Sequence, residues 1–390
     1  MSEVTADLNP RALLAYCRAE LPAMLDCLRK SVEIESPSNS KVAVDRLAAY
    51  FARQFRRAGA RVQLLNHRTA GSAVAAEFFS RRAASERRAK PILLLGHLDT
   101  VWDLGTLERM PFRIRGGRAY GPGILDMKSG IVCGLWAIRA LRALKIHPAG
   151  PVRYFLNSDE EVSSLAFRNR IVAEARKAKA VLVLEPAVPG GALKTARKGV
   201  GEFEITVRGR SAHAGVDPAA GVNAIAELAR QLLRVEKFAR PRSGLTLNVG
   251  VIRGGTRTNV IPASASATVD VRIPRMKDRL TLERKVYGLR PIDPKARLIV
   301  RGGINRPPME RARAIGLFRQ ARELGRQMGM SLREAGTGGG SDGNFTAALG
   351  IPTLDGLGGV GDGAHAVDEH IIMRELPRRA ALLAALLATL

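Results

Sequence analysis

The chain has 390 residues, enough for two domains and a large core, and its contents of 46% hydrophobic and 25% charged residues are ordinary for a soluble globular protein. No apolar run approaches the ~20 residues that a membrane helix needs, so we expect no membrane partner. The net charge of +26 suggests a nucleic-acid partner, but the basic residues, mostly arginine, are dispersed through every segment, which favours a compositional bias or attraction of anionic substrates.

Residues 1–10 are polar and lack the pattern of a signal peptide. Cys17, Cys27 and Cys133 show neither pairing nor zinc-knuckle spacing, which suits a reducing compartment, so we expect a cytoplasmic protein. The first half of the chain alternates helical and strand-like patterns, which predicts an α/β domain with a doubly wound, mostly parallel sheet. The helical patterns cover 11–34, 40–58, 131–144 and 165–177, and the strand-like runs cover 61–65, 72–79, 91–95, 152–157 and 180–184.

The densest basic cluster lies in a polar stretch between two of these strand-like runs, and we interpret it as an exposed hairpin tip. No aromatic residues alternate with the basic ones, as binding of a single nucleic-acid strand would require. The sequence therefore argues against a nucleic-acid partner. The cluster consists of Arg81, Arg82, Arg87, Arg88 and Lys90.

The pattern changes near residue 200, where alternation over 202–207 is followed by a helix over 221–238. Further strand-like runs follow, and they predict a small α+β layer of ferredoxin-like type with its helices on one face. We therefore predict a catalytic domain of residues 1–198 and 303–390, interrupted by an inserted domain over 199–302. The remaining elements are strands at 245–251, 265–273 and 297–301, a long helix over 307–330, a glycine-rich loop, a strand at 351–354 and a final helix.

A histidine and an aspartate follow the buried run 91–95 in the sequence Gly96-His97-Leu98-Asp99. Ligands bind at the carboxyl ends of strands in open α/β sheets. Residues two apart on an extended chain face the same side, so Asp99 could orient the imidazole of His97. Taken alone, a solvated polar strand end is an equally good interpretation.

Four other polar sites occur near the ends of predicted elements. Asp126 lies in a glycine-rich turn before a helix, where it could simply cap that helix. Glu160 and Glu161 belong to an acidic run after the strand 152–157, and Glu185 follows the strand 180–184. His365 follows a glycine-rich segment, and a lone histidine more often has a structural role than a metal-binding one.

Together these residues predict a transition-metal centre, because two imidazoles and several carboxylates follow the ends of strands in one sheet. Two zinc ions ~3.5–4 Å apart require a bridging carboxylate and terminal ligands on each ion. Neighbouring residues of an extended chain point in opposite directions, so Glu160 could take a proton while Glu161 binds metal. The five predicted ligands are His97, Asp126, Glu161, Glu185 and His365.

The chain resembles the M20 family of co-catalytic zinc metallopeptidases, and most closely its glutamate-carboxypeptidase-like branch. The motifs that carry this resemblance span nearly the whole chain in family order. They are HLDTVW (97–102), GPGILDMKSG (121–130), NSDEEV (157–162), LEP (184–186), RSAHAG (210–215), TNVIP (258–262), VRIP (271–274) and GAHAVDE (363–369).

The resemblance implies two zinc ions per subunit, with cobalt or manganese as possible substitutes. His97, Asp126 and Glu185 would hold one ion, and Asp126, Glu161 and His365 the other. Asp126 would then bridge the two ions, and its peptide bond to Met127 is expected to be cis.

Further roles follow from the resemblance for residues outside the ligand set. Glu160 is expected to be the general base and acid, with Asp99 supporting His97. His213 and Asn259 are expected to act on the substrate across a homodimer, His213 by stabilising the oxyanion. The substrate carboxylate is expected to contact Arg272 and the loop around Gly340, while Lys198 is either a further anion contact or a hinge residue.

The expected activity is hydrolysis of the amide bond to a C-terminal amino acid with a free carboxylate, in a small peptide or an N-acyl amino acid. A deacylase of the acetylornithine or succinyl-diaminopimelate type is the first alternative. A basic nucleic-acid-binding protein that retains the fold is the second, and the intact ligand set argues against it.

Overall fold

The computed structural model describes residues 8–79 and 89–390, so the predicted hairpin tip lies outside the described residues except for Lys90. The chain forms two compact units. The first contains the residues up to Ala196 together with 311–337 and 341–390, and the second contains Arg197–Glu310 and Gly338–Gly340. None of the helices in the described ranges combines the length and apolar character that crossing a membrane requires.

A mixed sheet forms the centre of the first unit, and β2 is the strand that runs antiparallel to both of its neighbours. The pairs β6–β3, β3–β7 and β7–β14 are parallel. The predicted α/β class with a mostly parallel sheet is therefore confirmed. In the described part of the chain the order across the sheet is β1 (Arg61–Leu65), β2 (Ala73–Phe78), β6 (Val152–Asn157), β3 (Ile92–His97), β7 (Ala180–Val183) and β14 (Thr353–Leu354).

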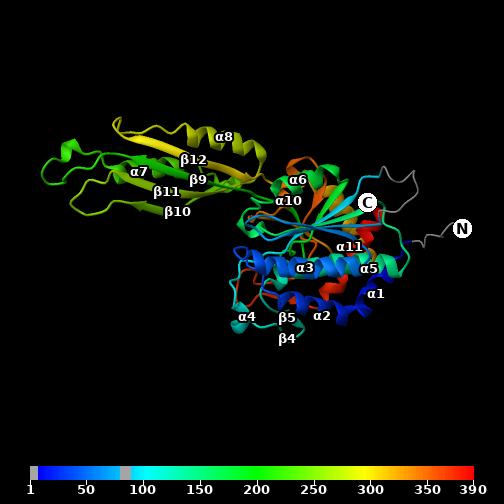
Figure 1. Cartoon of the computed structure of the whole chain (residues 1–390). Helices are drawn as coiled ribbons and strands as arrows, with labels where there is room; N and C mark the ends of the chain where they lie inside the picture. The colour runs from blue at the N-terminus through cyan, green and yellow to red at the C-terminus, as the bar shows by residue number, and fades with distance from the viewer. Residues whose placement is uncertain (1–7, 80–88) are drawn as a thin grey trace. The chain divides into compact units, whose positions relative to one another are not determined.

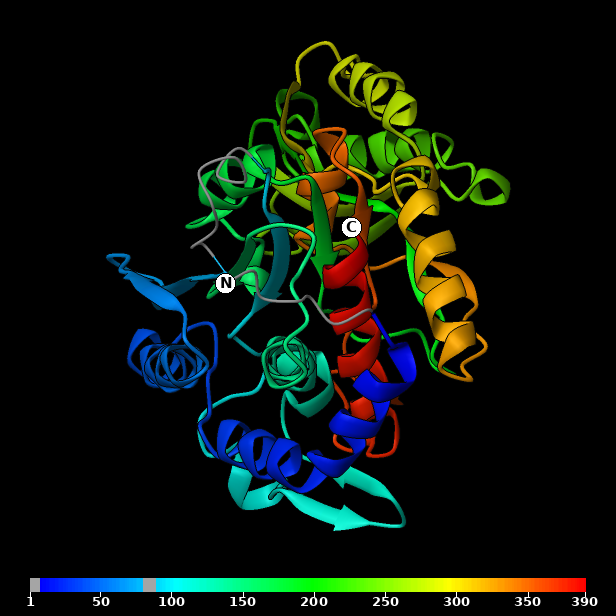
Figure 2. The same cartoon turned by 90° about the vertical axis from the view of Figure 1, so that its right-hand side faces the viewer.

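Helices cover both faces of this sheet, as Figure 1 shows. Helices α3 and α5 pack on one face, while α6 and α10 pack on the other. Figure 2 shows α11 beside α1 and α5, with which it makes extensive contacts. The helices are α1 (Pro10–Ala19), α2 (Leu21–Val32), α3 (Lys41–Arg57), α4 (Thr106–Arg109), α5 (Ser129–Ala143), α6 (Arg168–Lys177), α9 (Ile315–Gln327), α10 (Gly343–Ala348) and α11 (Glu375–Thr389).

Short strands complete the first unit. One small sheet joins two segments that are distant in sequence, because β5 (Arg118–Tyr120) pairs antiparallel with β16 (His370–Ile372). This pairing brings the residues that follow β5 next to those that precede β16. The other short strands are β4 (Arg113–Arg115), β15 (Gly361–Asp362), β8 (Leu193–Arg197) and β13 (Glu334–Thr337).

Two predicted helices are wrong in extent, and prolines explain both differences. The pattern over 11–34 forms two helices that meet at Glu20, because Pro22 in the first turn of α2 lacks the N–H that a continuous helix needs. The helix predicted over 307–330 begins only at Ile315. Residues before a proline favour extended backbone, so the strand ahead of Pro307 continues to Arg306 instead.

The second unit is an antiparallel sheet with helices α7 and α8. Residues 199–306, all of them described, contain the strands in the order β10–β11–β9–β12, which is the ferredoxin-like arrangement. Alternation along β9 buries Phe203, Ile205 and Val207 in its core. The elements are β9 (Gly199–Arg208), α7 (Ala224–Glu236), β10 (Thr246–Gly254), β11 (Ser264–Ile273), α8 (Met276–Tyr287) and β12 (Arg297–Arg306).

Two glycines let other segments approach the end of β7 in the first unit. A Cβ atom at Gly130, in the first turn of α5, would lie 1.9 Å from the carbonyl oxygen of Leu184. A Cβ atom at Gly358 would lie 2.1 Å from the same oxygen. The first turn of α5 and the segment around Gly358 therefore pack directly against the residue that precedes Glu185.

We predict that Gly130→Ala destabilises the protein by about 1–3 kcal/mol, because the added methyl group meets backbone that cannot move aside easily. Gly316→Ala is the matched control, since it also lies in a helix and a Cβ atom there has no neighbour within 4 Å. Thermal unfolding should show a lower midpoint for the first variant and an unchanged or slightly higher one for the second. Equal midpoints would contradict the packing argument.

Candidate metal centre

Four of the polar residues predicted from the sequence lie at or just after the ends of three adjacent parallel strands. His97 ends β3 and is paired with Asn157 at the end of β6, and Glu160 and Glu161 follow β6. On the other side of β3, β7 ends one residue before Leu184, which donates its N–H to the carbonyl of Leu95. The carboxyl ends of parallel strands share one edge of the sheet, so these side chains meet there.

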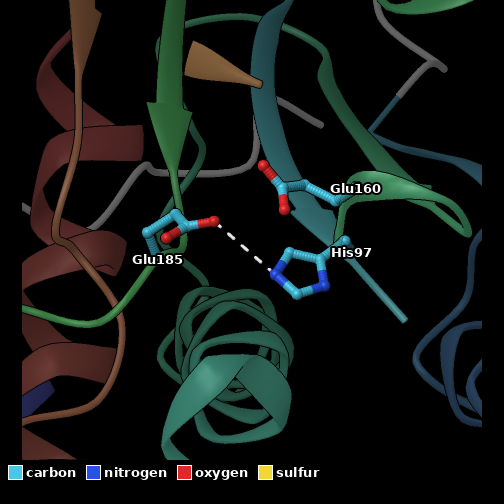
Figure 3. A group of neighbouring side chains, drawn as sticks. All are labelled: His97, Glu160 and Glu185. Carbon is cyan, nitrogen blue, oxygen red and sulfur yellow. Dashed lines mark ion pairs between the residues drawn. The ribbon is translucent and has the colours of Figure 1, made fainter. Parts of the chain in front are cut away.

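The side chains of His97 and Asp126 converge with that of Glu185. The Nε2 atom of His97 lies 3.2 Å from Oδ1 of Asp126 and 3.6 Å from Oε1 of Glu185. His97 is buried, with 2% of its side chain exposed. Figure 3 shows the imidazole of His97 facing the carboxylate of Glu185, with the side chain of Glu160 close to both.

The second histidine approaches the other oxygen of the same aspartate. The Nε2 atom of His365 lies 3.5 Å from Oδ2 of Asp126 and 3.2 Å from Oε1 of Glu161. Asp126 therefore directs one oxygen at each imidazole, which is the arrangement that a bridging carboxylate requires. The peptide bond between Asp126 and Met127 is cis, as predicted.

Two overlapping groups of side chains have ligand atoms within 4.8 Å of one another. One group is His97, Asp126 and Glu161, and the other is His97, Glu160 and Glu185. Imidazole nitrogens and carboxylate oxygens are ligands that zinc and related transition metals accept, so the residues present fit a metal centre. Glu160 stands in the second group although we predicted it to be the base, so its carboxylate lies close to the predicted ligands as well (Figure 3).

Asp99 contacts His97, but chiefly through its backbone. The carbonyl oxygen of Asp99 lies 2.9 Å from Nδ1 of His97, whereas the nearest carboxylate oxygen is 3.5 Å away. That carboxylate accepts the N–H groups of Glu160 and Glu161, each at 3.1 Å, and the hydroxyl of Ser38 at 2.7 Å. Asp99 therefore holds the acidic run in place as well as orienting the imidazole.

The histidines and carboxylates shift one another's pKa values strongly. The carboxylates of Asp126 and Glu161 raise the pKa of His365 to about 10. Burial opposes a charge on His97, but Asp126, Asp99 and Glu185 outweigh it and raise its pKa well above 6.5. Burial also raises the pKa of Glu161. Groups of this kind favour a cation in their midst, whether a proton or a metal ion.

Sequence reasoning missed two residues beside this centre. Lys194 on β8 is buried, and its charge helps to lower the pKa of Asp126. Glu369, the last residue of the GAHAVDE motif, is fully buried and accepts hydrogen bonds from the turn that carries Asp126. The acidic end of that motif could have identified Glu369 as part of the site, whereas no sequence motif pointed to Lys194.

In the second unit the structure brings the segments of His213 and Asn259 together. Ala214 donates its N–H to the carbonyl of Asn259, and His213 forms a β-bridge with Val260. Nδ1 of His213 accepts the N–H groups of Gly215 and Val216 at 3.1 and 3.2 Å. The neutral ring therefore carries its proton on Nε2, where it can be donated.

The other predicted substrate contacts also belong to the second unit. The Nε and Nη2 atoms on one edge of the Arg272 guanidinium donate hydrogen bonds of 3.0 Å to Asp270, two residues earlier on β11. The carbonyl of Gly340 accepts a hydrogen bond of 3.0 Å from Arg197, a buried arginine that the sequence did not single out. Lys198 lies half-buried at the start of the unit, next to β9.

Comparison with known proteins explains why the proposed metal ligands and substrate contacts occur together in one chain. Residues 93–389 match the model of peptidase family M20/M25/M40. The chain belongs to this family. It is therefore a hydrolase, as its motifs predicted.

Individual members of the family resemble the chain over most of its length. The chain is 30% identical to carboxypeptidase G2 of Pseudomonas sp. (strain RS-16), with 99% of this chain and 93% of that protein covered. It is 28% identical to succinyl-diaminopimelate desuccinylase of Verminephrobacter eiseniae (strain EF01-2), covering 75% and 77%. The crystal structure of aminopeptidase PepT from Bacillus cereus ATCC 10987 matches with a TM-score of 0.79 at 21% identity, covering 94% and 98%. The names of these three similar proteins state different activities.

We predict that the metal-free protein loses stability as the pH rises from about 6.5 to about 10. His365 has an ordinary pKa of 6.5 and a folded pKa of about 10, so its charge stabilises the fold fully below the first value and not above the second. Chelator-treated protein should therefore unfold at lower temperature as the pH increases through this window.

Two controls separate this effect from other titrations. His365→Ala should shrink the loss of stability, whereas His147→Ala, which removes an exposed histidine, should leave it intact. In metal-loaded protein the charge of His365 should not add to this pH dependence of stability, because a metal-bound imidazole is already neutral. An identical pH dependence in wild type and His365→Ala would show that His365 is not the titrating group.

Proposed function

We propose that the protein hydrolyses the amide bond between an acyl or peptidyl group and a C-terminal amino acid with a free carboxylate. The observation that carries this proposal is the position of Asp126 between His97 and His365, with one carboxylate oxygen toward each. One metal ion would be held by His97, Asp126 and Glu185, and the other by Asp126, Glu161 and His365. We propose zinc as the native metal, with cobalt or manganese as substitutes, because the donor set is nitrogen and oxygen.

Ions held by these residues would polarise the scissile carbonyl and ease ionisation of the attacking water. Glu160 is the group that would move the proton. Its carboxylate lies within reach of the His97 and Glu185 ligand atoms, and its backbone is fixed by Asp99. It would accept the proton of the water and then donate it to the leaving amine. Asp99 would keep Glu160 and the imidazole of His97 in a constant relative orientation.

We predict that Glu160→Ala lowers kcat by at least about 10²–10⁴-fold while the bound metal is retained, because general base catalysis contributes on that scale. Metal content by elemental analysis and turnover of an N-acyl amino acid should be measured on the same preparation. Glu161→Ala is the comparison variant, and it should lose metal as well as activity. A near-normal rate in Glu160→Ala would refute the assigned role.

We also propose that the enzyme is a homodimer in which His213 and Asn259 act on the substrate bound by the partner subunit. Support comes from the local geometry of the second unit, where His213 presents a protonated Nε2 and lies beside the Asn259 segment. A neutral imidazole that donates a hydrogen bond can stabilise the oxyanion of a tetrahedral intermediate.

Mixed dimers test this arrangement. Glu160→Ala and His213→Ala should each be inactive alone, but mixing them should restore activity if His213 acts across the dimer. Half of the random dimers are then hybrid, and each hybrid contains one complete site, so about a quarter of the wild-type activity is expected. No restored activity under conditions in which subunits exchange would contradict action in trans.

The substrate carboxylate is proposed to contact Arg272 and the loop around Gly340, with Lys198 as a further anion contact. Asp270 already binds Arg272, so a substrate carboxylate would have to replace or share this partner. A panel of γ-glutamyl, peptidyl, acetyl and succinyl amino acids would separate carboxypeptidase from deacylase activity. We expect hydrolysis of peptidyl amino acids, and activity confined to acetylornithine or succinyl-diaminopimelate would establish the alternative.

We propose a cytoplasmic location on the basis of the cysteines. Cys17, Cys27 and Cys133 are all free and buried in the described structure. Reduced cysteines suit a reducing compartment. Fractionation of cells that express the chain would test the location, and recovery outside the cytoplasm would contradict it.

A further inference from the structure

The carboxylate of Glu369 is saturated with hydrogen bonds from the surroundings of the proposed metal centre. Its Oε1 atom accepts the N–H groups of Leu125 at 2.8 Å and Asp126 at 3.0 Å. Its Oε2 atom accepts the N–H of Gly123 and the indole N–H of Trp102, both at 2.9 Å. Glu369 itself has no exposed surface, so water does not compete for these bonds.

These bonds join three segments that carry proposed ligands. Trp102 belongs to the segment that leaves β3 after His97, and Asp126 is the bridging residue itself. Glu369 follows His365 in the GAHAVDE motif, so its own backbone is continuous with the third segment. The pairing of β5 with β16 supports the junction, since Gly121 also donates its N–H to the carbonyl of Glu369.

Glu369 does not serve as an ordinary cap of α5. The helix begins at Ser129, whereas the bound N–H groups lie before it, in a kinked turn where Asp126 has φ −111° and ψ 95°. These angles are not helical, so the turn needs partners other than helical hydrogen bonds. The carboxylate of Glu369 supplies them, and the buried amine of Lys128 adds a nearby positive charge.

We propose that Glu369 is a positioning residue that fixes Asp126 relative to His97 and His365 and thereby sets the spacing of the two metal positions. This inference rests on the proposed function, because it assumes that Asp126 bridges two ions. The carboxylate acts through the backbone of Asp126 and does not touch the substrate or the ions. Residues that orient metal ligands in this way typically change metal affinity about 10–100-fold when they are replaced.

The test is Glu369→Gln, which keeps the size of the side chain but replaces one oxygen by an NH₂ group. That group would face two N–H donors and could accept neither. We expect the zinc Kd, measured by competition with a chromogenic chelator, to rise about 10–100-fold. The thermal midpoint of the metal-free protein should be recorded on the same samples.

A matched control separates positioning from general destabilisation. Glu227 in the second unit is also fully buried and accepts the N–H groups of Ile292 at 2.8 Å and Asp293 at 3.1 Å. Glu227→Gln therefore disrupts the same kind of carboxylate–backbone interaction within the second unit, whose residues are not proposed metal ligands. It should lower the midpoint of the metal-free protein and leave the zinc Kd unchanged.

Trp102→Phe provides a second, milder variant in case Glu369→Gln does not fold. It removes one donor to Oε2 and keeps an aromatic ring, so a smaller rise in the zinc Kd is expected. An unchanged zinc Kd in the folded variants at residues 369 and 102 would overturn the inference. Wild-type protein that neither binds zinc nor hydrolyses any substrate of the panel would instead refute the proposed function, so the two failures are distinguishable.

Discussion

Several buried carboxylates within a few ångströms of one another are the feature on which the rest of the structure depends. Like charges at this distance, removed from water, oppose folding unless cations lie between them. The imidazoles of His97 and His365 meet this need in the metal-free protein, since their raised pKa values keep them protonated. The same convergence of nitrogen and oxygen atoms suits divalent ions, which would replace those protons.

The sheet makes this concentration of charge possible. Parallel strands β6, β3 and β7 end at one edge, so residues that follow each strand meet without long loops. Loops alone would leave ligand positions imprecise, because irregular segments are more mobile than the elements that they connect. Asp99 and Glu369 reduce this freedom by binding the backbone N–H groups of the acidic run and of the Asp126 turn.

The two units divide the proposed work. The first contains the complete set of proposed metal ligands and the proposed base Glu160, while the second contains the groups proposed to bind the substrate and stabilise its oxyanion. Within the second unit these groups are exposed or half-buried on loops and on the sheet, as residues that meet a ligand must be. The proposed hydrolysis would therefore use residues of both units.

The sequence by itself determined the α/β class, the approximate positions of the central strands and the identity of the converging residues, because hydrophobic periodicity and short motifs are local properties of the chain. Helix ends near Pro22 and Pro307 were less predictable, because the helical spacing of apolar residues continues past these prolines although the helix itself cannot. Only the tertiary structure revealed that Glu369 holds the Asp126 turn and that the Asp99 carboxylate holds the Glu160–Glu161 backbone. Such bonds join segments far apart in sequence, and no local pattern encodes which buried carboxylate will meet which unpaired N–H group.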